Sequence, residues 1–220
     1  TAARVAYEDI IAAQPDAQWA RVALADVLMT QNQPDAAESL LRAVQKADPG
    51  NPDAALGIAR ILASKGDYDG AVQQIAKIGA SNGGDSAAAD SREVRADAVT
   101  QFFDEGVARI GTLTAQMRSA WEAGTDTREA LYKATSAQNA RVTGLLTILK
   151  SAPPASTDSE QRQKAYKQRI YAASLLSQSI AALLKFLETS DADSGATATL
   201  QLTEFQKELK LARDITPGGK

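Results

Sequence analysis

Residues 16–49, DAQWARVALADVLMTQNQPDAAESLLRAVQKADP, and residues 50–83, GNPDAALGIARILASKGDYDGAVQQIAKIGASNG, follow one pattern. Equivalent positions lie 34 residues apart, as Ala25 and Ala59 do. A fixed period of this size is typical of stacked supersecondary units, and it outranks any single motif. The period therefore predicts that the N-terminal third of the chain is an array of repeated elements.

Each period contains two segments in which apolar residues recur at helical spacing. The first pair of predicted helices covers residues 19–30 and 34–47, separated by a polar turn. Pro34 stands where a proline in the first turn of a helix is tolerated. The second pair covers residues 52–62 and 68–78, so each period predicts a helix–turn–helix unit.

This pattern resembles the tetratricopeptide repeat, a helix–turn–helix unit of the same length. Alanines at fixed positions let the two helices approach closely, and large residues fill the gaps between the ridges. The chain departs from the family at Gly83, where a third proline would fall, and at Val44 and Ile78, where alanine is frequent. The matching positions are Leu24, Ala25 and Leu28 with Ile58, Ala59 and Leu62; Ala3, Ala37 and Ala71; Tyr7, Leu41 and Ile75; and Pro15 and Pro49.

The pattern predicts a half repeat in residues 1–15, repeats in residues 16–49 and 50–80, and a linker in residues 81–90. Half a repeat cannot bury its apolar face alone. We therefore expect the chain to be a fragment of a longer array, or to have lost its start by proteolysis. A lone capping helix is the alternative.

The resemblance implies that partner-binding residues lie on the first helices of the repeats, which line the concave groove. In the chaperone-binding members of the family, Lys and Asn hold a peptide carboxylate at such positions, and this chain lacks that clamp. We expect Trp19, Met29 and Leu56 to be apolar anchors rimmed by Asp26 and Arg60; for Trp19, packing against the preceding helix is the alternative. The predicted groove residues are Trp19, Val22, Asp26, Met29 and Thr30 in one repeat and Asp53, Leu56 and Arg60 in the next.

Residues 91–214 lack the period and carry four long amphipathic patterns joined by short connections. They predict an antiparallel four-helix bundle, followed by a tail in residues 215–220. Gly106 and Gly111 fall inside the first of these helices, where each costs about 1 kcal/mol relative to alanine. They indicate either close helix contact or a kink. No family resemblance is identified in this part.

Composition restricts the chemistry, because the chain has neither histidine nor cysteine. The commonest general base, the commonest transition-metal ligand and any thiolate are therefore missing. The carboxylate pairs Asp104 with Glu105 and Asp191 with Asp193 are not expected in apolar surroundings that would raise a pKa. We expect no enzyme activity, no cofactor and no metal. A net charge of −3 argues against a nucleic-acid partner.

Two features of the C-terminal half have simple interpretations. The basic residues Arg162, Lys164, Lys167 and Arg169 are interrupted by Glu and Gln, and they indicate a solvated face rather than an anion site. No run reaches the roughly 20 apolar residues that a membrane span requires. Leu175–Leu187, the most apolar segment, contains polar residues and predicts a buried helix.

The predicted function is a non-catalytic, all-α interaction scaffold or adaptor that binds a protein through the groove. The bundle would cap the array, dock a second partner or form a homo-oligomer. The alanine-rich repeats are similar to the periplasmic repeat region of the cellulose synthase operon protein C family. This likeness implies a bacterial envelope or export assembly and favours the periplasm over the cytoplasm, although no residue assigns the compartment.

Two alternatives remain open at the level of the sequence. The chain could be a structural spacer in polysaccharide secretion, which acts through length and rigidity rather than through a groove. It could also be a sugar- or lipid-handling bundle, which the 5% aromatic content disfavours.

Overall fold

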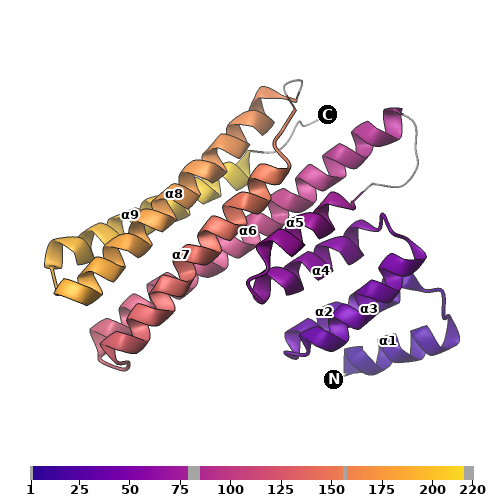
Figure 1. The fold of residues 1–220 in the computed structure, drawn as a ribbon, viewed down its shortest axis with the longest axis horizontal. Helices are drawn as coiled ribbons and strands as arrows, with labels where there is room; N and C mark the ends of the chain where they lie inside the picture. Colours follow the sequence, from indigo (N-terminus) through magenta and orange to yellow (C-terminus); the bar gives the residue numbers. More distant parts are fainter. Residues whose placement is uncertain (1, 79–84, 156–157, 216–220) are drawn as a thin grey trace. The chain divides into compact units, whose positions relative to one another are not determined.

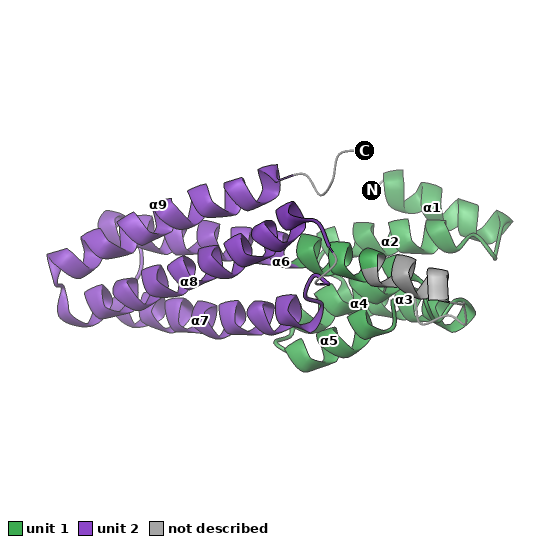
Figure 2. Cartoon of the chain, turned by 90° about the horizontal axis from the view of Figure 1, so that it is seen from above, with its two compact units in different colours: residues 1–102 green, residues 103–220 purple. Residues whose placement is uncertain are grey.

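The computed structural model describes residues 2–78, 85–155 and 158–215, without the side chains of residues 85–92 and 94. In this part of the chain α-helices are joined by turns and loops and no strand occurs, which confirms the predicted all-α class (Figure 1). Two compact units divide the chain, the repeat unit (residues 1–102) and the bundle unit (residues 103–220) (Figure 2). The helices are α1 (Ala2–Ala13), α2 (Gln18–Thr30), α3 (Pro34–Ala47), α4 (Pro52–Ser64), α5 (Tyr68–Ala76), α6 (Asp85–Ala123), α7 (Arg128–Ser151), α8 (Glu160–Thr189) and α9 (Ala192–Asp214).

The repeat unit is built from helix pairs that follow one another in sequence. Helix α2 packs against α3, and α4 packs against α5. The two pairs meet through α3 with α4 and through α2 with α4, while α1 packs on α2. This is the neighbour-to-neighbour stacking that the 34-residue period predicts.

The turns inside the two pairs repeat in backbone detail as well as in sequence. Asn32 and Gly66, 34 residues apart, both have positive φ, at 58° and 87°. The next residue in each turn, Gln33 or Asp67, donates its amide hydrogen at 2.9 Å to the carbonyl five residues earlier, that of Leu28 or Leu62. This is the hydrogen-bond pattern of a Schellman motif, which ends a helix and reverses the chain. Each first helix therefore ends at the same place in its repeat.

Alanines and large aliphatic residues at the predicted positions form the core of the repeat unit. Ala25, Ala37, Ala59 and Ala71 are buried, and Leu41 lies in the core cluster beside the first helices. The small side chains let the helices approach while the larger ones fill the spaces between them. By contrast, α1 has no buried residue.

The predicted linker differs from the structure in its second half. Residues 85–90 belong to α6, which begins at Asp85 rather than at Ser91. The run Ala87–Ala89 explains this, because alanine has the highest helix propensity and no side-chain entropy to lose. Residues 81–84 lie outside the described residues. The division between the units falls inside α6, between Phe102 and Phe103.

The bundle unit contains the second part of α6 with α7, α8 and α9. Helix α8 packs against both α7 and α9. At one end, Met117 and Trp121 of α6 pack on a cluster that Leu131, Leu183 and Leu187 share with Ala198. Side chains from all four helices thus meet in one core.

The two glycines of α6 mark close contacts between helices. A Cβ atom on Gly106 would lie 2.7 Å from the Cδ1 atom of Leu145, and one on Gly111 would lie 2.5 Å from the Cε1 atom of Phe205. Both distances are too short for a real contact. The close-contact interpretation of these glycines is therefore confirmed.

One buried ion pair joins α6 to α8 and corrects the expectation for one basic residue. Arg169 donates from Nε and Nη2 to the two carboxylate oxygens of Asp104, at 2.9 and 2.8 Å. Both residues are only 8% exposed. Arg213 of α9 adds a hydrogen bond to the Asp104 carbonyl at 2.6 Å. Arg169 therefore does not belong to a solvated basic face, because it occupies the inward side of α8. Asp104 is buried as well, but its surroundings are charged rather than apolar, since Arg169 and Arg213 both contact it.

One helix in the described part of the chain, α8, is long and apolar enough to cross a membrane by length and composition alone. One such helix is not a clear membrane span, so the expectation that the chain has none is not overturned. The core helix of a soluble protein passes the same test. In this structure α8 buries Leu176, Ile180 and Leu183 against its neighbours.

Candidate protein-binding surface of the repeats

All eight predicted groove residues lie on α2 and α4, which lie side by side in the repeat unit. The start of α4 is fixed by Pro52 at its first position and by Asn51, whose side-chain oxygen accepts a hydrogen bond from the Ala54 amide at 3.0 Å. A proline and an N-cap of this kind satisfy groups that a helix start leaves unpaired. The two helices thus form a defined platform for the candidate site.

Trp19 is the most exposed large apolar residue of this platform, at 60% of its full surface. Its ring meets the Tyr7 ring of α1 edge-on, with centroids 6.5 Å apart and an interplanar angle of 84°. Tyr7 itself packs against the core of the repeat unit. Trp19 therefore contacts the preceding helix and still presents most of the indole to solvent, so its two sequence interpretations do not exclude each other.

The other expected anchors are less available. Leu56 is only 8% exposed, which leaves almost no surface for a partner and corrects its expected role as an anchor. The reason is that α4 is flanked by α2, α3 and α5, which bury more than one of its faces. Val22, 34 residues before Leu56, and Met29 are half-buried and pack against the core cluster.

The polar members of the predicted groove have mixed availability. Asp26 and Asp53 are exposed, and Asp53 lies in the first turn of α4. Asp26 and Arg60 each take part in an interaction within the protein. The Thr30 hydroxyl donates to the Val27 carbonyl at 2.7 Å, so its donor is already used. The surface is therefore an exposed aromatic residue next to a helix pair that carries exposed carboxylates.

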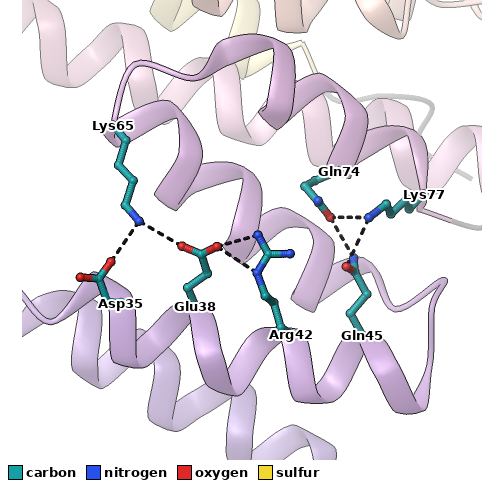
Figure 3. Close-up of polar contacts among 7 residues, drawn as sticks. All are labelled: Asp35, Glu38, Arg42, Gln45, Lys65, Gln74 and Lys77. Carbon is teal, nitrogen blue, oxygen red and sulfur yellow. Dashed lines mark hydrogen bonds and ion pairs between the residues drawn. The ribbon is translucent and has the colours of Figure 1, made fainter.

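A second polar surface, which the sequence interpretation missed, joins α3 to the turn between α4 and α5 and to the end of α5 (Figure 3). Lys65 donates to Asp35 and to Glu38, both at 3.0 Å, and Arg42 donates to the same Glu38 carboxylate at 2.6 and 2.9 Å. Further along, Gln45, Gln74 and Lys77 exchange hydrogen bonds. We call these seven residues, Asp35, Glu38, Arg42, Gln45, Lys65, Gln74 and Lys77, the polar ladder.

The charges of the polar ladder shift the pKa values of two of its members. Hydrogen bonds from Arg42 and then from Lys65 lower the pKa of Glu38. Hydrogen bonds to Asp35 and then to Glu38 raise the pKa of Lys65. The signal in the sequence was the opposite charge of residues that face each other once two repeats are stacked, which a search within single helices does not reveal.

The described residues contain no group of three or more metal-ligating side chains.

The comparisons with known proteins agree with the geometry of the repeat unit. Residues 1–49 and 28–93 match the family model described as Tetratricopeptide repeat. The N-terminal part of the chain is therefore a tetratricopeptide repeat segment, as its period and alanine positions predicted. Repeats of this family generally mediate protein–protein interaction and are generally not catalytic. Neither curated proteins nor solved structures give a match to the chain.

Proposed function

We propose that this chain is a non-catalytic scaffold or adaptor whose α2–α4 surface binds a segment of a partner protein, with Trp19 as the main anchor. The observation that carries the proposal is the 60% exposure of Trp19 on the first helix of a repeat. Tryptophan is enriched among residues that dominate binding energy. Contact with Tyr7 already restricts the indole, so less side-chain entropy is lost when a partner binds.

The charges on the same helix pair as Trp19 suggest what the partner carries. Asp26 on α2 and Asp53 on α4 are exposed carboxylates on the same helix pair. Complementary charge favours encounter and orientation more than final affinity. We therefore propose a partner segment with an apolar side chain for Trp19 and basic residues beside it.

The test compares Trp19→Ala with Tyr171→Ala, which removes an aromatic residue of similar exposure from α8 in the bundle unit. The full-length chain and both variants capture partners under identical conditions, and the dissociation constant of each captured partner is then measured. We expect Trp19→Ala to weaken binding by about 30-fold, the effect of losing a hot spot of about 2 kcal/mol. Tyr171→Ala should have no effect, and circular dichroism should show unchanged helicity. Equal binding by both variants would contradict the proposal.

A structural spacer is the second candidate, and the polar ladder favours it. These side chains tie successive repeats together on the surface, and the buried Leu56 reduces the groove that a ligand could use. A spacer acts through length, so deleting residues 16–49, one whole period, should abolish assembly while Trp19→Ala leaves it intact. Loss of assembly in both variants would instead favour the adaptor.

We also propose a bacterial envelope or export assembly as the setting, on the likeness of the alanine-rich repeats to the cellulose synthase operon protein C family. Cell fractionation of the native protein tests this proposal. Recovery in the periplasmic or membrane fraction would support it, and recovery in the cytosol would contradict it.

A further inference from the structure

The outer face of α9 carries a stripe of four residues, Leu200, Glu204, Lys207 and Leu211, which we call the α9 stripe. Their spacing of four, three and four places them on one side of the helix. Both leucines are exposed, at 61% and 46% of their full surface. Leucines on a helix that already has a complete inward face need a different explanation from core packing.

The inward face of α9 is indeed complete without the stripe. Ala198, Leu202, Phe205, Leu209 and Ala212 are buried and repeat at helical spacing on the opposite side of the helix. The ring of Phe205 fills the space opposite Gly111 of α6. The α9 stripe therefore adds nothing to the core of the bundle unit.

The order of residues in the α9 stripe is self-complementary. Leu200 and Leu211 are equally far from the midpoint of the stripe, and so are Glu204 and Lys207. In an interface with two-fold symmetry, residue i of one copy meets residue j of the other while j meets i. Two antiparallel stripes would therefore bring Leu200 against the partner's Leu211 and Glu204 against the partner's Lys207, each contact occurring twice.

We propose that two copies of this chain associate by antiparallel packing of their α9 stripes around a two-fold axis. A parallel pairing is disfavoured because it would place each charged residue opposite the same residue of the other copy, so that like charges would meet. A lipid surface is disfavoured because Glu204 lies at the centre of the stripe, 3.4 Å from Lys207. In the antiparallel pair these two ion pairs combine into an alternating group of four charges between two leucine contacts.

The expected association is weak, because two leucine contacts for each copy make a small interface. Interfaces of this kind belong to transient complexes, and we expect a dissociation constant above about 1 μM. The measurement is sedimentation velocity of the full-length chain over a concentration series that reaches the high micromolar range. The weight-average mass should rise from the 23.2 kDa of one chain towards twice that value.

Charge reversal gives the sharpest test, because the prediction depends on which copies are mixed. Glu204→Lys alone places two lysines opposite each other, and Lys207→Glu alone places two glutamates opposite each other. Each single variant should associate at least about tenfold more weakly than the natural chain. An equimolar mixture of the two variants, or the double variant alone, restores opposite charges at both contacts and should restore association.

Matched variants of exposed apolar residues distinguish association through the α9 stripe from non-specific hydrophobic association. Leu200→Ser and Leu211→Ser should each abolish association, whereas Tyr171→Ser, at an exposed aromatic residue on α8, should not. Circular dichroism establishes that each variant keeps its helices. Trp19→Ala should also leave association unchanged, because the inference is independent of the proposed function.

Three outcomes would overturn the proposal. One is a natural chain that remains monomeric at every concentration. The second is association that does not weaken with either single charge reversal, or that mixing the two variants fails to restore. The third is a monomeric chain that binds phosphatidylcholine vesicles and loses this binding in Leu200→Ser, which would make the α9 stripe a membrane-facing surface.

Discussion

The repeat unit and the bundle unit are both built from α-helices, but the helices of each unit make different kinds of contact. In the repeat unit, helices pack against their neighbours in sequence, and the charged groups form a ladder at the surface, where Lys65 keeps 44% of its side chain exposed. In the bundle unit, the ion pair between Asp104 and Arg169 joins residues 65 positions apart and is buried. The first kind of contact follows from a local period, whereas the second depends on helices that are distant in the chain. Substitutions should therefore have larger effects in the bundle unit than at the ladder.

One tryptophan in each unit makes this comparison measurable, because Trp19 lies in the repeat unit and Trp121 in the bundle unit. In a Trp121→Phe background, fluorescence during urea unfolding reports on the repeat unit. In a Trp19→Phe background it reports on the bundle unit. The free energy of unfolding of each unit is then measured in the full-length chain.

The largest expected effect is that of Asp104→Ala in the bundle unit. The substitution leaves the Arg169 guanidinium buried without its carboxylate partner, and breaking a buried pair in this way costs about 3–5 kcal/mol. Urea unfolding in the Trp19→Phe background measures the loss.

The control is the double variant Asp104→Leu with Arg169→Met, which removes both charges and keeps apolar side chains in the space. Replacing a buried pair by apolar residues is often neutral or stabilising. We expect a stability within about 1 kcal/mol of the natural chain. A single variant that is no less stable than this double variant would show that the ion pair is not desolvated.

A smaller effect is expected from filling the glycine contacts of the two units. Gly111→Ala directs a methyl group into the rigid ring of the buried Phe205, and overpacking of this kind costs about 1–3 kcal/mol. Gly57→Ala in α4 meets the Cδ1 atom of Leu41 at 2.7 Å, the flexible end of a side chain. The gain of about 1 kcal/mol in helix propensity should nearly offset that contact. Equal losses of stability in Gly111→Ala and Gly57→Ala would show that the two units tolerate an added methyl group equally well.

The turns of the repeats provide a matched pair with an expected effect of about 1 kcal/mol. Gly66 has a φ of 87°, which a residue with a Cβ atom adopts only with strain, so Gly66→Ala should destabilise the repeat unit. Asn32→Gly, at the equivalent position with a φ of 58°, should have little effect, because asparagine tolerates this conformation. Thermal unfolding of both variants in the Trp121→Phe background measures the difference. A neutral Gly66→Ala would show that the turn can end the helix without positive φ.

The smallest expected effect belongs to the polar ladder and depends on pH. Because Arg42 and Lys65 lower the pKa of Glu38, its contribution is complete above the unfolded pKa and is lost as the pH falls through the lower, folded pKa. Glu38→Gln should therefore cost about 0.5 kcal/mol at neutral pH and nothing in acid. Urea unfolding at several pH values tests this.

The control for Glu38→Gln is Glu8→Gln, which removes an exposed pair with Arg4 on α1 and should cost less. A cost of Glu38→Gln that does not change with pH would show that the lost interaction is not with the ionised carboxylate.

Much of the repeat unit could be predicted because its contacts are local. The period placed Ala25, Ala37 and Ala59 in the core and put turns at Asn32 and Gly66, since each depends only on positions within one or two repeats. The candidate site was predictable only in part. Trp19 is exposed as an anchor requires, but Leu56 is buried, because the number of helices that flank α4 is a property of the stacked array.

The sequence predicted the helices of the bundle unit but not the side-chain contacts between them. Periodicity identified an inward stripe on each helix, yet it could not show that Arg169 turns inward while its neighbours Lys164 and Lys167 are exposed. Helical spacing assigns each residue to a face of its helix. Whether a charged residue at the edge of that face is buried depends on which side chain of the neighbouring helix lies opposite it.

The sequence by itself determined the all-α class, the helix pairs of the repeats and the small residues between them, because these features arise from spacing along a single segment. Only the tertiary structure decided that Asp104 meets Arg169, that the polar ladder joins successive repeats and that two leucines of α9 remain on its outer face. Each of these depends on which helices lie side by side, and that arrangement is a property of the packed chain rather than of any one of its helices.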